Sequence, residues 1–200
     1  MYTFFHKQKD LDPDFYFAIQ IDNNGILQSV FWADKRSRND YFTFGDVIVF
    51  DVTYKTNKFM MPFASFTGVN HHRQSILFGC ALLSDETEES FVWLFNEWLK
   101  CMLGTVYNVI ITDMDAAMYK AIQIVFPNTR HRFCSWHIGK HLVEHVHNFR
   151  DNDNEFKKDY YTWFNSISVN SCEHNWCELV SKHKINDNTW LAKMWHKRMH

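Results

Sequence analysis

The order of its apolar segments constrains the fold of this chain more than any other feature. Three strand-like runs, Val47–Thr53, Met60–Gly68 and Ser75–Leu83, follow one another with only the short polar turns KTNK and NHHRQ between them. Turns of this length predict that the three strands pair as antiparallel neighbours. Two further apolar runs, Val106–Thr112 and Thr129–Phe133, predict a fourth and a fifth strand.

Helical patterns separate and follow these last two strands. Glu88–Leu103 places large apolar residues at helical spacing after an acidic first turn, which suits a helix N-terminus. Ala116–Phe126 follows Asp115, which we interpret as an N-cap, and is closed by Pro127. From Ser135 onward every segment has a helical pattern.

A hairpin is expected in front of this arrangement, because Phe15–Asp22 and Ile26–Trp32 flank an Asn-Asn-Gly turn. Asp34–Phe44 then predicts a charged helical link. The resulting order is that of a ribonuclease H-like α/β domain, with a mixed five-stranded sheet, a preceding hairpin and a truncated all-helical insertion behind it. We expect three domains: an extension over 1–44, the core over 45–150 and the helical region over 151–200.

Composition excludes several classes of protein. The chain has only 6 Gly and 3 Pro in 200 residues, unlike collagen, flexible linkers or low-complexity segments. Its formal net charge of −2 weighs against autonomous, tight DNA binding, because nucleic-acid-binding modules are usually strongly basic. Five cysteines are too few, and odd in number, for a disulfide framework. No stretch approaches the roughly 20 apolar residues of a membrane span, so we expect a soluble, intracellular chain without a membrane partner.

Two aspartates are the first candidates for chemistry. Asp51 interrupts an apolar, β-branched strand, and Asp113 directly follows another one. If the two strands are neighbours, both carboxylates converge at one edge of the sheet, where they would bind Mg²⁺ or Mn²⁺ through oxygen ligands. We predict that they face one solvent-accessible pocket. The alternative is that Asp51 makes a local hydrogen bond and Asp113 only ends its strand.

Cys134 and His137 form a C-x₂-H unit, which is half of a tetrahedral zinc site. The remaining ligands could come from His131, His141, Cys172, His174 and Cys177. One half-site is weak evidence, so a packed cysteine and a histidine bound to the backbone are the favoured interpretation. His137, His141 and His145 also recur on one helical face, near Arg130, Arg132, Lys140 and Arg150. This basic stretch could face phosphates, but a solvated helix face is slightly favoured.

Several motifs together carry a resemblance to a known family: FDVTYKTN, GVNHH, SDETEESFVWL, ITDMD and FPNTRHRFCSWH. From about Phe15 onward the chain resembles the central domain of the plant far-red impaired response proteins, which is itself similar to Mutator-like element transposases. The resemblance implies a ribonuclease H-like transposase fold with an Asp-Asp-Glu metal triad. It implies that Asp51 and Asp113 are the first two acids and that Cys134 and His137 are the family's C-x₂-H signature.

The third acid has no counterpart in this chain. In the family it lies beyond the helical region, whereas this chain stops at MWHKRMH, and Glu144 would be a choice from topology alone. The terminal zinc-binding domains of the full-length regulators are also lacking, so we expect a fragment or the product of a truncated gene.

The resemblance therefore implies a domesticated transposase domain of a nuclear transcription regulator, without catalysis, with DNA as a partner in the full-length context. The alternatives are an active transposase using two divalent metal ions, and an interaction module that associates with itself or with related chains. We also expect the aromatic residues of the helical tail to be partly exposed and to promote self-association. These are Phe156, Trp163, Phe164, Trp176, Trp190 and Trp195.

Overall fold

The computed structural model describes residues 2–53, 57–106, 108–146, 154–185 and 189–197, except for the side chains of 142–146. It divides into two compact units, Met1–His137 and Ile138–His200, which are considered separately below. The division falls inside helix α5 (Ser135–Val146), whereas the sequence suggested boundaries after residues 44 and 150.

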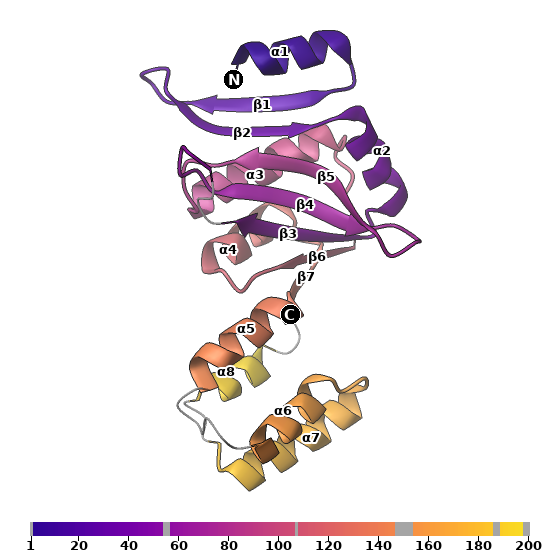
Figure 1. Ribbon diagram of the computed structural model, residues 1–200, viewed down its shortest axis with the longest axis vertical. Helices are drawn as coiled ribbons and strands as arrows, with labels where there is room; N and C mark the ends of the chain where they lie inside the picture. The colour runs from indigo at the N-terminus through magenta and orange to yellow at the C-terminus, as the bar shows by residue number, and fades with distance from the viewer. Residues whose placement is uncertain (1, 54–56, 107, 147–153, 186–188, 198–200) are drawn as a thin grey trace. The chain divides into compact units, whose positions relative to one another are not determined.

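Unit 1 is built on one mixed sheet of seven strands in the order β1-β2-β5-β4-β3-β6-β7 (Figure 1). The strands are β1 (Tyr16–Ile21), β2 (Leu27–Ala33), β3 (Val47–Thr53), β4 (Phe63–Val69), β5 (Ser75–Leu82), β6 (Val109–Thr112) and β7 (Arg130–Phe133). The strands β3, β4 and β5 pair as antiparallel neighbours, as predicted, and β6 and β7 continue the sheet parallel to β3. The predicted α/β core is therefore confirmed.

The predicted hairpin joins this sheet rather than standing in front of it. Strand β2 pairs with β5, so β1 and β2 extend the five-stranded core to seven strands. Helix α1 (Tyr2–Leu11), which the sequence pattern did not predict, packs Phe5 against the hairpin residues Phe15 and Val30. Asp12-Pro13 just after α1 is a helix-stop signal that could have located its end.

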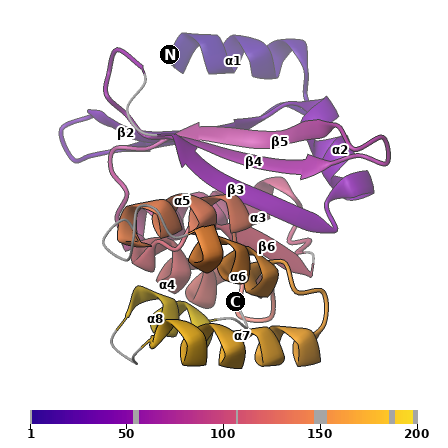
Figure 2. The ribbon, with the colours of Figure 1, turned by 60° about the horizontal axis from the view of Figure 1, so that its bottom comes forward.

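The remaining helices of unit 1 are α2 (Lys35–Phe44), α3 (Glu88–Cys101) and α4 (Ala116–Val125). Figure 2 shows α1 on one side of the sheet and α3 and α4 on the other. The main core lies between the sheet and α3, where Trp98 stacks on Phe66 at 4.0 Å and Phe50 meets Phe95 edge-on at 5.0 Å. Many of the aromatic side chains of unit 1 thus pack together in this core.

Strand β4 begins three residues later than predicted. Met60 adopts a left-handed backbone conformation with φ of 55°. Pro62, just before the first strand residue, has no N–H and so cannot donate a hydrogen bond to a neighbouring strand. The segment Asn57–Met61 instead forms a turn in which the Asn57 side chain accepts from the N–H of Phe59. A local turn therefore overrides the apolar pattern that predicted a strand.

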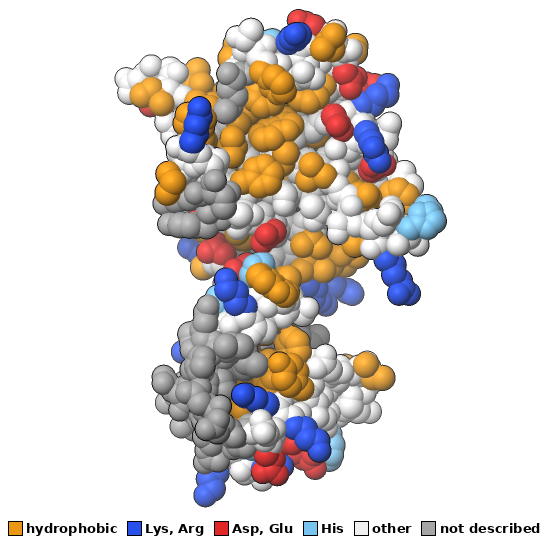
Figure 3. All heavy atoms as spheres, viewed as in Figure 1, with side chains coloured by type: hydrophobic (Ala, Val, Ile, Leu, Met, Phe, Trp, Pro, Cys, Tyr) orange, Lys and Arg blue, Asp and Glu red, His pale blue; other side chains and the backbone are white. Residues whose placement is uncertain are grey.

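The sheet face seen in Figure 3 is partly apolar, with orange side chains gathered over β2, β5 and β4. Leu77 on β5 is 44% exposed and Val69 on β4 is 54% exposed. Helices α3 and α4 lie on the opposite face, so this face keeps exposed apolar side chains.

Unit 2 contains α6 (Asn154–Phe164), α7 (Val169–His183) and α8 (Trp190–His196). Its aromatic residues bury one another: Trp176 stacks on Trp195 at 4.9 Å and 3°, and contacts Trp163 at 4.9 Å. The expectation that the tail aromatics are partly exposed is thus wrong for Phe156, Trp163 and Trp176, which are buried, whereas Phe164, Trp190 and Trp195 are half-buried. The helical pattern did not reveal that α8 folds back to complete this cluster. Within the described residues, no helix is both long and apolar enough to cross a membrane.

Candidate functional site

Asp51 and Asp113 lie at the carboxyl ends of two adjacent strands. Strand β3 runs parallel to β6, with Val49 paired to Ile111, so continuing the register by two residues aligns Asp51 with Asp113. Side chains alternate along a strand, which places both aspartates on the sheet face opposite the buried Phe50 and Ile110. The predicted adjacency of the two strands is confirmed. That both carboxylates share one pocket stays a prediction.

Buried hydrogen bonds fix the end of β6 beside Asp113. The Thr112 hydroxyl donates to the Asp113 carbonyl at 2.7 Å, so its oxygen accepts from Nε2 of His131 at 2.8 Å. Thr112 and His131 are both buried on the core face. His131 is therefore a structural residue of β7 in this arrangement. The Asp113 carboxylate itself accepts the N–H of Met114 at 2.6 Å.

His137 approaches Asp51 from the first turn of α5. Its Nε2 lies 3.6 Å from Oδ1 of Asp51. The Asp51 side chain is 44% exposed, whereas His137 is 18% exposed, and the imidazole Nδ1 has no hydrogen-bond partner among the described residues. The sequence identified each residue separately. It did not indicate their contact, which depends on β7 lying next to β6 and β6 next to β3.

Cys134 helps to position this turn. Its backbone N–H donates to the Thr112 carbonyl at 2.7 Å, which continues the pairing of β7 with β6 up to the start of α5. Its side chain is half-buried. In the described part of the chain, no group of three or more His, Cys, Asp or Glu side chains is placed to hold a metal ion. The C-x₂-H unit therefore has no closed zinc site around it there.

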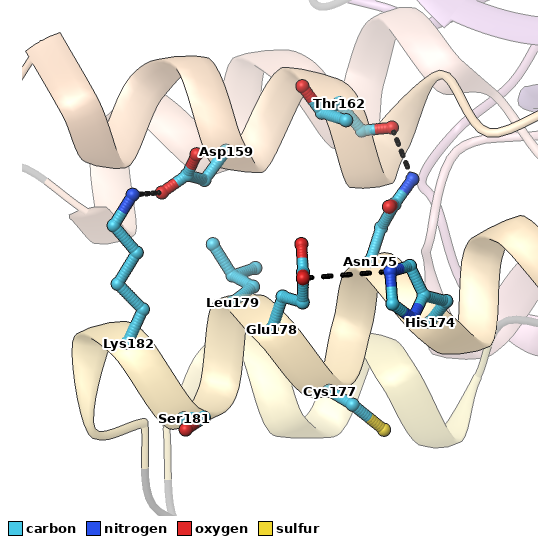
Figure 4. A pocket seen from close by; sticks show the side chains of 9 residues that line it. All are labelled: Asp159, Thr162, His174, Asn175, Cys177, Glu178, Leu179, Ser181 and Lys182. Atoms are coloured by element: carbon cyan, nitrogen blue, oxygen red, sulfur yellow. Dashed lines mark hydrogen bonds and ion pairs between the residues drawn. The ribbon is translucent and has the colours of Figure 1, made fainter.

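The C-terminal zinc candidates lie on α7, beside a hollow between α6 and α7 (Figure 4). His174 is 3.6 Å from the Glu178 carboxylate, and the Cys177 side chain points away from His174. Lys182 Nζ lies 2.8 Å from the Asp159 carboxylate. The hollow is lined by internally paired polar groups rather than by a convergent ligand set.

Two arginines share the sheet face of the acids. Strand β7 pairs with β6 so that Arg130 lies opposite Val109 and Arg132 opposite Ile111. Ile111 lies on the same face as Asp113, so both arginines belong to that face. The predicted basic stretch therefore begins on an edge strand beside the acids. Of its later members, the side chain of His145 and all of Arg150 lie outside the described residues, as does the side chain of Glu144, the third-acid candidate.

Asp115 is an N-cap, as predicted. Its carboxylate accepts the N–H of Met118 at 2.8 Å at the start of α4. A carboxylate oxygen used in this way satisfies a helix N–H that would otherwise have no partner.

Comparison with known proteins gives consistent matches. Residues 47–141 match the model of the MULE transposase domain. The chain is 43% identical over 188 residues to Protein FAR1-RELATED SEQUENCE 5 of Arabidopsis thaliana, covering 94% of this chain and 24% of the relative. It is 40% identical to Protein FAR1-RELATED SEQUENCE 7, covering 98% and 25%, and 38% identical to Protein FAR-RED IMPAIRED RESPONSE 1, covering 94% and 23%, both from the same plant. The chain thus spans about a quarter of the length of these relatives.

Proposed function

We propose that this chain, whose residues 47–141 match the MULE transposase domain family, contacts DNA without cutting it. In this proposal it is a domesticated transposase domain that serves a nuclear transcription regulator. The regulatory role is supported by the resemblance to the far-red impaired response proteins. The contact with DNA is supported by the residues at the carboxyl edge of the sheet.

The two acids suit a hard divalent cation. Asp51 and Asp113 offer carboxylate oxygens on one sheet face, and Mg²⁺ is commonly held by one or two carboxylates together with several waters. A bound cation would neutralise charge on a nearby phosphate and polarise its P–O bonds. The part of the two aspartates would be to orient that cation toward the DNA backbone.

The pairing of Asp51 with His137 carries the proposal that the domain does not cleave. Phosphodiester cleavage by two metal ions needs enough anionic ligands to anchor both ions. Here the group beside Asp51 is an imidazole, 3.6 Å away, rather than a third carboxylate. A neutral or cationic imidazole supplies no negative charge, so among the described residues two aspartates alone would have to anchor both ions.

Arg130 and Arg132 supply the attraction to DNA. Both lie on β7, at the edge of the sheet and on the face of the acids. Arginine binds phosphate through a planar fork of donors, and each phosphate neutralised contributes a salt-dependent term to affinity. This local charge is compatible with the nearly balanced charge of the whole chain.

Two assays test the proposal on the same protein. In a plasmid assay with Mg²⁺ or Mn²⁺, we expect no nicking of supercoiled DNA. In a duplex-binding assay at several salt concentrations, replacing Arg130 and Arg132 by Gln should weaken binding and reduce the salt slope by about one unit for each phosphate that is no longer neutralised. Arg36→Gln, in an 88% exposed side chain on α2, is the matched control and should leave the slope unchanged.

Metal-dependent nicking that disappears in Asp51→Ala would identify an active transposase instead. An unchanged affinity and an unchanged slope in the double arginine variant would contradict the assigned DNA surface. A wild-type chain that binds no DNA but self-associates in light scattering would favour the interaction module.

A further inference from the structure

Trp136 is the single exposed tryptophan of this chain. All eight tryptophans lie within the described residues, and the other seven are buried or half-buried. Trp136 is 67% exposed, although it stands in the first turn of α5 beside the candidate site. Tryptophan combines a large apolar ring with a polar N–H, and it is enriched at binding interfaces for that reason.

The Trp136 indole is linked to Asp51 through contacts with its sequence neighbour, His137. The Trp136 ring meets the His137 imidazole edge-on, with centroids 4.7 Å apart, and His137 in turn contacts Asp51. His137 is largely buried, so it limits how far the adjacent residue can move. Trp136 therefore offers its exposed ring surface at a defined place at the edge of the site.

A second exposed apolar group lies in the connection between β3 and β4. The turn that precedes β4 exposes Phe59 at 61% and Met60 at 59%. Lys58 lies over the Phe59 ring at 4.8 Å, which adds a positive charge to this turn. The turn before β4 thus offers an exposed ring and a cation, and β7 adds two arginines on the sheet face of the acids.

We propose that Trp136 is a stacking surface for an unpaired nucleobase of the nucleic acid that this site contacts. This inference rests on the proposed function and adds that the site prefers single-stranded or locally unpaired DNA over fully paired duplex. Every base has a π-face, so stacking on indole tolerates any sequence, while the arginines and Lys58 meet the phosphates. In a closed duplex the bases are already stacked on one another and cannot reach the ring.

The test compares two DNA probes at one fixed salt concentration: a labelled oligothymidylate and a fully paired hairpin duplex. Trp136→Ala should weaken binding of the oligothymidylate by roughly 5- to 100-fold, the range expected for losing one stacked base, and leave the duplex nearly unchanged. Trp136→Phe should keep most of the affinity because it keeps an aromatic face. Phe4→Ala, which removes a 57% exposed ring on α1, is the matched control and should change neither probe.

Equal affinity of wild type and Trp136→Ala for the oligothymidylate would overturn this inference. An equal loss of affinity for both probes would also overturn it, because the ring would then not discriminate unpaired bases from paired ones. Both results leave the proposed function standing if the duplex still binds through Arg130 and Arg132. A wild-type chain that binds neither probe overturns the proposed function itself, and this inference with it.

Discussion

Asp159 joins the two helices on either side of the unit 2 hollow. Its carboxylate accepts hydrogen bonds from Lys182 Nζ at 2.8 Å and His183 Nε2 at 2.9 Å, both on α7. These two partners hold the pKa of Asp159 below its ordinary value. A carboxyl whose folded-state pKa is lowered stabilises the fold above its unfolded pKa, and this contribution is lost as the pH falls through the folded pKa.

We therefore expect the packing of α6 on α7 to weaken in acid, below about pH 4, where aspartate titrates. The variant Asp159→Asn has no carboxyl to titrate at this position. Its free energy of unfolding should therefore fall less than that of the wild type when the pH is lowered from 5 to below about 4. Urea unfolding followed by tryptophan fluorescence measures this. Glu178→Gln is the control, since Glu178 is 71% exposed and faces only His174 at 3.6 Å. Parallel pH profiles for wild type and Asp159→Asn would contradict the prediction.

Candidate site residues were predicted best where a polar residue interrupts or ends an apolar strand pattern. An aspartate inside an apolar strand, Asp51, and one at a strand end, Asp113, stand out from the sequence alone, and the structure places their strands side by side. The contact of His137 with Asp51 could not be predicted, because it needs the order of three strands and the direction of α5. The sequence made no prediction for Trp136, because its exposure depends on the direction in which α5 leaves β7.

At the scale of elements, the pairing of β4 with β5 depends on Gly68. A Cβ added there would lie 2.4 Å from ring atoms of Phe78, which is fully buried and packs edge-on against Tyr41 at 5.4 Å. We expect Gly68→Ala to lower the free energy of unfolding by about 1–3 kcal/mol through overpacking. Urea unfolding monitored by circular dichroism measures this.

The smaller side chain of Phe78→Leu should relieve that contact. In a double-mutant cycle, Gly68→Ala should therefore cost less in the Phe78→Leu background than in the wild type. Strictly additive effects of the two substitutions would show that Phe78 is not the reason for glycine at this position.

Elements that follow from local pattern were predicted to within about three residues, and β3 was predicted with both of its ends. The errors have tertiary or turn-level causes. The hairpin β1–β2 joins the sheet because β2 pairs with β5. The local pattern of Ile26–Trp32 does not indicate this pairing partner. Helix α1 has only a weak apolar face, and the packing of Phe5 on the hairpin stabilises it. The spacing of its apolar residues alone therefore did not predict this helix.

At the scale of the whole molecule, each compact unit has its own buried core. The main cluster of unit 1 centres on Trp98 and its phenylalanine neighbours, and the cluster of unit 2 centres on Trp163 and Trp176. The sequence did not predict a division into two cores, since that division depends on which helices fold back on one another.

Removing a central tryptophan from either core should therefore affect that unit first. Trp176→Ala takes away a buried ring that contacts both Trp163 and Trp195, and we expect it to cost about 3–5 kcal/mol. Hydrogen exchange should then show reduced protection in α6, α7 and α8 while the amides of β3, β4 and β5 keep theirs. Trp98→Ala, in a ring that is 1% exposed within unit 1, should give the reverse pattern, and Tyr161→Ala, in a 60% exposed ring on α6, should change neither unit. If Trp176→Ala lowered protection equally in the sheet and in the helices, the two cores would unfold as one cooperative structure, and the division into independently stable units would be wrong.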